Sequence, residues 1–548
     1  MISTKSRLKT VFMAILIVGG WYLAWRELPG SVARLSFLIT IKLAFEVTAI
    51  CLFVGAPATY AAFRQPRWSR LPSLLIGVSG GSLLVPTIAR SLSFCALFSY
   101  YGPLATGLRD LGLWPQGQPL DSSHTAVVIA LVTLYLPFAI IILSESMQSL
   151  GRLPDLASIF GANGLQTAIR VTLPRLFRPI AIGGLVIFSQ TLGVIITPRI
   201  LGSEDVTLAI LIDDLLKRTM DTQAALRVAI GEMAVAVPIA AIAAYYIEKE
   251  MTARSRPIQP ALRFRGGVTL ALLPIGALIV VPLTLLALSL ERSPVLDITS
   301  VFRSGPTLQW YWRALMDVGF RSVALTSLWV WITAAVLSII PAALASVLVL
   351  PHPQVRRFFR CMALILLFVP QNALGILLFM ALSGLPAGQF FMPGWFLAGI
   401  GQAVPGVAFS FLLMDRGADR LVRSLNLAGT FGANARQRFI SIAIPNLMPA
   451  VVAALVATAL ITLDDIIFVR YLPHLPVNTF ATELFGRARY GAAPDLAAAC
   501  VLVALVILAL LGTMFLARAI PRIRRRIVAL PQVPPPANIV PDLVRRTL

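Results

Sequence analysis

The chain contains the stretch DLASIFGANGLQTAIRVTLP at residues 155–174, and a second version of it, NLAGTFGANARQRFISIAIP, at residues 426–445. Both versions include the tetrapeptide FGAN, and their glycines, Gly161 and Gly432, are 271 positions apart. Because 271 is about half of the 548 residues, the repeat predicts two homologous halves with one such element in each.

The composition predicts an all-α polytopic membrane protein. Hydrophobic residues make up 58% of the chain and charged residues only 13%, whereas soluble domains have roughly 25% charged residues. Many apolar runs reach the ~20 residues that a helix needs to cross a ~30 Å hydrocarbon core. Helices satisfy their own backbone hydrogen bonds and are therefore the expected form of these spans.

We predict about twelve transmembrane helices, six in each half. In the first half they fall at 11–25, 35–63, 71–100, 125–143, 176–196 and 227–247, with a break in the third at Gly80–Gly81 and Pro86. In the second half they fall at 268–289, 320–350, 361–384, 392–414, 446–470 and 496–517. The predicted domains are a first repeat at 1–250, a cytoplasmic linker at 251–267, a second repeat at 268–518 and a basic, Pro-rich tail at 519–548.

The net charge of +22 follows from the predicted topology. Lys and Arg cluster at the N-terminus, in the loops at 64–70 and 351–360, in the linker and in the tail. Cytoplasmic loops carry such an excess, so both termini and both repeat elements are expected on the cytoplasmic face of a bacterial inner membrane. This distribution argues against nucleic acid as a partner.

The sequence of the repeat element predicts two short helices joined by a turn. Asp155 and Asn426 are expected to be N-caps of the first short helix in each copy. Gly161 and Gly432 permit a sharp turn or the close approach of a partner. An ordinary amphipathic loop is the alternative, but two copies at equivalent places favour a functional element.

Two further residues complete the pattern of each copy. Ala157 and Ala428 keep one face of the first short helix thin. Pro174 and Pro445 stand at the start of the next span, where a helix tolerates proline.

This element resembles the EAA loop in permease subunits of bacterial ATP-binding-cassette importers. In that pattern Glu-Ala-Ala precedes a glycine by three residues, and nine more residues lead to Ile-x-Leu-Pro. Asp155 and Asn426 occupy the position of the glutamate, Gly161 and Gly432 match the glycine, and the copies end in VTLP and IAIP. Asp155 keeps the carboxylate one methylene shorter, whereas Asn426 carries no charge.

The resemblance implies a type I importer permease with both halves fused. In the family the loop is a coupling helix that docks on an ATPase dimer, and a separate periplasmic or extracellular protein delivers the solute. The chain has no GxxxxGK[ST] motif, so no ATP hydrolysis and no cofactor is expected in it, and the partner ATPase would use ATP and Mg²⁺. The segment TALITLDDIIFVRYL at 458–472 is similar to spermidine/putrescine-type permeases. Permeases for iron(III), thiamine, opines and phosphonates share the framework.

Charged residues inside spans are candidates for the solute path. Glu46 lies one helical turn from Lys42, so the two form either a structural ion pair or part of a path. The adjacent Asp464 and Asp465 either meet interfacial water with Arg470 as partner or line a path for a cation such as a polyamine.

Two other classes stay open at this point. The segment MDRGADRLVR at 414–423 resembles a loop motif of 6+6 secondary transporters of the major-facilitator type, but it follows the fourth span of its half instead of the second. A non-transporting membrane scaffold is the other alternative. The solute itself is not specified by any of these motifs.

Overall fold

The structure is a computed structural model. It describes residues 4–63, 70–100, 102–115, 118, 120–150, 153–202, 205–252, 267–292, 305–349, 352–383, 392–416, 418–472, 477–488 and 493–527. Every regular element among these residues is helical. The predicted linker and the Pro-rich end of the tail fall largely outside the described residues.

The first half contains the predicted spans as helices. They are α1 (Thr4–Glu27), α2 (Gly30–Phe63), α3 (Leu71–Ser82) with α4 (Thr87–Phe98), α6 (His124–Leu150), α9 (Leu173–Leu192) and α12 (Thr222–Thr252). Shorter helices are α5 (Pro103–Asp110), α10 (Ile196–Ile200) and α11 (Leu208–Lys217).

The second half follows the same order. Its long helices are α13 (Gly267–Ser289), α16 (Val318–Val349), α17 (Pro353–Phe368) with α18 (Gln371–Ser383), α19 (Gly394–Asp415), α22 (Ile444–Asp464) and α25 (Pro494–Ile527). Shorter helices are α15 (Gln309–Met316), α23 (Ile467–Tyr471) and α24 (Phe480–Ala488).

Nine helices in the described part of the chain are long and apolar enough to cross a membrane, or eleven if each bent pair counts as one span. The predicted first span falls in α1, which is not one of these candidate spans. The first side chains of α1 lie outside the described residues. The structure therefore confirms an all-α polytopic protein.

One span in each half is sharply bent. Helices α3 and α4 meet at 98° just before Thr87, as the proline at position 86 predicts, while Gly80 and Gly81 lie inside α3. Helices α17 and α18 meet at 103° at Pro370, which has no N–H to continue a helix. The span predicted at 361–384 is therefore present as a bent helix pair, and its bend at Pro370 was not predicted.

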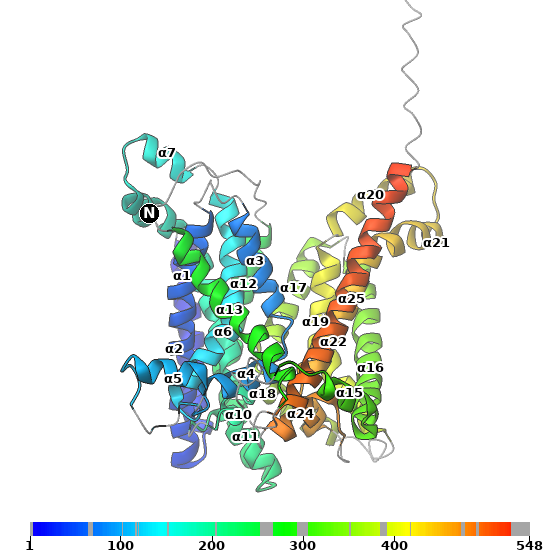
Figure 1. The fold of residues 1–548 in the computed structure, drawn as a ribbon. Coiled ribbons are helices and arrows are strands. Elements are labelled where there is room, and N and C mark those ends of the chain that lie inside the picture. Colours follow the sequence, from blue (N-terminus) through cyan, green and yellow to red (C-terminus); the bar gives the residue numbers. More distant parts are fainter. Residues whose placement is uncertain are drawn as a thin grey trace, which may run out of the picture.

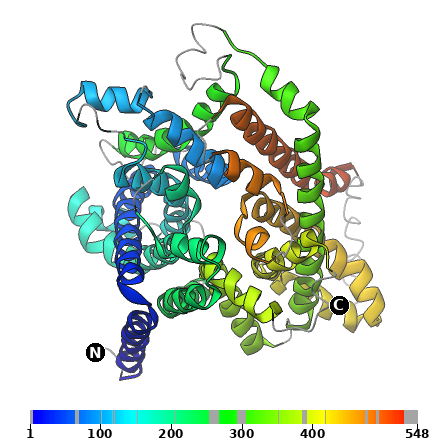
Figure 2. The ribbon, with the colours of Figure 1, turned by 90° about the horizontal axis from the view of Figure 1, so that it is seen from below.

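The two halves pack against each other through several helices. Figure 1 shows the two repeat regions, α7 and α20–α21, at the same end of the bundle, with the N-terminus and the end of α25. The interface joins α12 to α17 and α18, and α4 to α24. Helix α13, the first of the second half, lies along α2, α3 and α4 of the first, and the view along the bundle shows this close association (Figure 2).

Candidate functional site

The two repeat elements fold in the same way. In the first, α7 (Leu153–Ile159) leads through a turn to α8 (Gly164–Gln166) and the π-helical turn η2 (Thr167–Thr172). In the second, α20 (Ala418–Thr430) leads to α21 (Ala435–Arg438) and the π-helical turn η4 (Phe439–Ala443). Pro174 and Pro445 then stand in the first turn of α9 and of α22, as predicted.

The turn of each element requires its glycine. Gly161 has φ of 85° and Gly432 has φ of 81°, in the left-handed region that side chains with a Cβ disfavour. The next N–H closes the helix end, from Ala162 to the Ala157 carbonyl at 3.1 Å and from Ala433 to the Ala428 carbonyl at 3.0 Å. A Cβ on either glycine would meet no atom within 4 Å, so the constraint lies in the backbone.

The predicted N-caps were wrong. Asp155 is the third residue of α7 and Asn426 lies deep inside α20, so neither begins a helix. Asn163 caps the second short helix instead, where its Oδ1 accepts from the Gln166 N–H at 2.8 Å and its own N–H donates to Gln166 Oε1 at 3.1 Å.

The second copy repeats this capping box. Asn434 Oδ1 accepts from the Gln437 N–H at 2.8 Å, and the Asn434 N–H donates to Gln437 Oε1 at 3.0 Å. The spacing Asn-x-x-Gln, present in both repeats, is the sequence signal that identifies these caps.

Each element exposes apolar side chains at its tip. Phe160 and Phe431, at equivalent positions, are both 87% exposed, and Leu156 and Leu427 are exposed beside them. Large apolar side chains that stay exposed at equivalent places of a repeat indicate a protein interaction site rather than a core.

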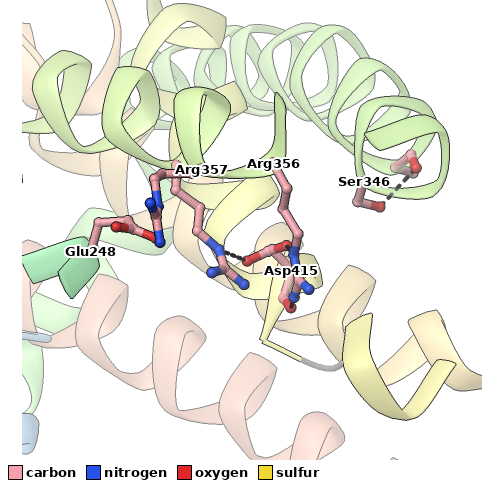
Figure 3. Close-up of polar contacts among 7 residues, drawn as sticks. Glu248, Ser346, Arg356, Arg357 and Asp415 are labelled. Atoms are coloured by element: carbon pink, nitrogen blue, oxygen red, sulfur yellow. Dashed lines mark hydrogen bonds and ion pairs between the residues drawn. The ribbon is translucent and has the colours of Figure 1, made fainter. Parts of the chain in front are cut away.

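A buried carboxylate anchors the second element to the bent helix pair (Figure 3). Asp415, the last residue of α19, is 2% exposed and forms ion pairs with Arg356 and Arg360 of α17. Arg356 Nε lies 2.5 Å from Asp415 Oδ1. The equivalent position in the first half is Ser144, whose buried hydroxyl has no partner among the described residues.

The same turn of α17 also reaches the first half. Arg357 Nε lies 3.1 Å from Oε1 of Glu248, which is buried near the end of α12. The start of α17 is thus joined by ion pairs both to the base of the second element and to the last long helix of the first half (Figure 3).

The adjacent aspartates of the second half hold two different helices. Asp464 Oδ1 accepts from the Thr87 N–H at 2.7 Å and Oδ2 accepts from the Thr87 hydroxyl at 2.6 Å, at the N-terminus of α4. Asp465 Oδ1 accepts from the Ile467 N–H at 2.9 Å, at the N-terminus of α23, and Oδ2 accepts from Gln402 at 2.9 Å. Both carboxylates therefore receive their hydrogen bonds from neutral groups.

Arg470 was considered as a partner of Asp464 and Asp465, but it pairs with Asp213 instead. Its Nη2 lies 3.2 Å from Oδ1 of Asp213, a buried residue of α11 in the first half. Arg199, the residue 271 positions before Arg470, lies 3.6 Å from the other oxygen of Asp213. The equivalent arginines of the two halves thus meet on one carboxylate at the interface.

Glu46 belongs to a small network between helices of the first half. Its Oε1 lies 3.9 Å from Lys42 Nζ, and its Oε2 lies 2.6 Å from His124 Nε2 at the start of α6. The other ring nitrogen of His124 contacts Asp205.

Comparison with known proteins adds to this geometry. No protein-family model matches the chain. It is similar to the spermidine/putrescine transport system permease protein PotB of Haemophilus influenzae, with 29% identity over 163 residues, 29% of this chain and 56% of that protein. Over about a third of its length, the chain is thus similar to a transport system permease protein.

Two further relatives show the breadth of this permease class. The molybdenum transport system permease protein ModB of Mycobacterium tuberculosis is 25% identical over 182 residues, 33% of this chain and 66% of that protein. PotB of Escherichia coli is 28% identical over 170 residues, 30% of this chain and 60% of that protein. The matches thus span about half to two-thirds of each permease, and the solutes that the relatives are named for differ.

Proposed function

We propose that the chain is the fused permease of a binding-protein-dependent ATP-binding-cassette importer. It forms the path of a small polar solute across the bacterial inner membrane, with both termini and both repeat elements in the cytoplasm. An ATPase dimer would bind on that face and use ATP and Mg²⁺, and a solute-binding protein would dock on the other.

The paired repeat elements carry the proposal. Both have the same backbone conformation, with a left-handed glycine, then a capping box, a π-helical turn and a proline. Both lie at the same end of the bundle (Figure 1). Two equivalent elements with exposed phenylalanines at their tips suit a partner with two equivalent binding sites, and a dimeric ATPase has two such sites.

For the solute we propose a cation related to the polyamines. The support is the similarity to two PotB proteins, whose names give spermidine and putrescine as solutes, and a role of Asp464 and Asp465 in the path stays part of this proposal. The similarity to ModB makes an oxyanion the competing candidate.

Reconstitution of the full chain with an ATPase and a binding protein from its own genomic neighbourhood tests the proposal. We expect ATP-dependent uptake of a small solute, and ATP hydrolysis that depends on the permease. A double variant, Phe160→Ser with Phe431→Ser, should still insert into the membrane but lose both activities. Normal uptake by this variant would contradict the coupling role.

A further inference from the structure

The contact surface of the two halves holds a buried polar cluster that the proposed coupling does not use. Glu232 lies in α12 of the first half and is 1% exposed, and Asn372 lies in the first turn of α18 and is 0% exposed. Asn372 Nδ2 donates to Glu232 Oε2 at 2.6 Å. The contact therefore joins the halves beside the bend at Pro370.

The cluster keeps oxygens without partners among the described residues. Glu232 Oε1 and Asn372 Oδ1 are both buried and unpaired, and so is the hydroxyl of Tyr471, at the end of α23. Tyr471 packs against α18, where its ring would lie 3.2 Å from a Cβ placed on Gly375. A buried carboxylate with one free oxygen is costly in a membrane protein unless a ligand or a proton uses it.

Gly193, at the end of α9, makes room for this amide. A Cβ on Gly193 would lie 2.8 Å from Asn372 Oδ1 and 2.9 Å from the Pro370 Cβ. Position 193, at the end of α9, is equivalent to position 464, at the end of α22. The second half has an aspartate at this position, whereas the glycine of the first half leaves space for Asn372.

The contrast with the adjacent aspartates is informative. Asp464 and Asp465 direct both of their oxygens at helix N-termini and side-chain donors. Glu232 directs only one oxygen at a donor, so it is the carboxylate that still has an acceptor to offer.

We infer that Glu232 and Asn372 form a site for the primary ammonium group of an amine solute, at the interface of the two halves. An ammonium group has three N–H donors and a positive charge, which suit an unpaired carboxylate oxygen and an amide oxygen. Secondary transporters bind solutes at repeat interfaces beside discontinuous helices, and this cluster has a comparable place, at the contact of the halves beside the bend between α17 and α18. The site is closed in this structure, since both side chains are buried.

The inference rests on the proposed function and is tested in the same reconstituted complex, with labelled putrescine and molybdate as probes. We expect wild type to take up putrescine, and Glu232→Gln to lower that uptake by about tenfold or more, because the charge of a charge-assisted hydrogen bond is lost. The side-chain amide that this substitution introduces can still accept from Asn372, so the variant should fold. Asn372→Ala and Gly193→Ala should also lower putrescine uptake.

The control is Glu483→Gln on α24, which neutralises a carboxylate that is paired at 2.7 Å with Arg487 on the same helix. It should keep wild-type uptake. Equal putrescine uptake by wild type and Glu232→Gln, or uptake of molybdate but not putrescine by wild type, would overturn the inference and leave the permease function standing. Failure of the permease to support any ATP hydrolysis or uptake would overturn both.

Discussion

Asp464 caps a helix of the other half: its two carboxylate oxygens accept from the main-chain N–H and the hydroxyl of Thr87, at 2.7 and 2.6 Å. Thr87 is the first residue of α4, just after the bend that separates α4 from α3. The first N–H groups of a helix have no partner within it and carry the positive end of its dipole, so an anion placed there stabilises the helix. The carboxylate thus joins the end of α22 to the bent span of the first half.

We predict that Asp464→Asn lowers the stability of the protein. An asparagine offers one acceptor and turns a donor toward Thr87, which costs about 1–3 kcal/mol. Thermal unfolding of the purified chain in detergent measures the change, with the half-exposed Asp495→Asn as the control. If unfolding is unchanged while uptake of a cation falls, Asp464 acts in the solute path and not as a cap.

The backbone of the repeat elements makes a second prediction. Gly432→Val forces a β-branched residue into a φ of 81° and should cost about 1–2 kcal/mol locally, with loss of permease-dependent ATP hydrolysis. Gly432→Asn should be tolerated far better, because asparagine adopts left-handed conformations and the space around Gly432 is open. Equal activity of the two variants would show that the left-handed turn is not required, and the same pair at Gly161 tests the first half.

The second half has a buried carboxylate, Asp415, where the first half has Ser144, so substitutions at these equivalent positions should change stability by unequal amounts. Asp415→Asn leaves Arg356 and Arg360 without their buried counter-charge and should destabilise the protein by about 3–5 kcal/mol. Ser144→Ala, at the equivalent place in the first half, should change stability by less than about 0.5 kcal/mol, since its hydroxyl makes no hydrogen bond among the described residues. Unfolding midpoints of both variants, measured side by side, check this difference.

The orientation of the bundle gives a fourth prediction. In a chain whose four cysteines are replaced, single cysteines at Gln166 and Thr430 should resist a membrane-impermeant thiol reagent added to intact cells. Both positions are exposed in the structure, so protection would come from the membrane. A cysteine at Met220, exposed at the opposite end, should react. Labelling at Gln166 and Thr430 would reverse the proposed topology.

Local features of the sequence were sufficient for much of this protein. Hydropathy identified the long helices, because the cost of burying polar backbone in lipid depends on each segment alone. The 271-residue repeat located both elements, and the conformational freedom of glycine predicted the turns at Gly161 and Gly432. The break before Thr87 followed from the proline at position 86.

The partners of the polar groups depended on tertiary structure. Thr87 and Asp464 are 377 positions apart, and the sequence around either residue does not predict its contact with the other. The same holds for Arg470 with Asp213 and for Glu232 with Asn372. Which donor a buried carboxylate meets is decided by how the bent helices of the two halves pack, and this long-range geometry leaves no periodic signal in the sequence.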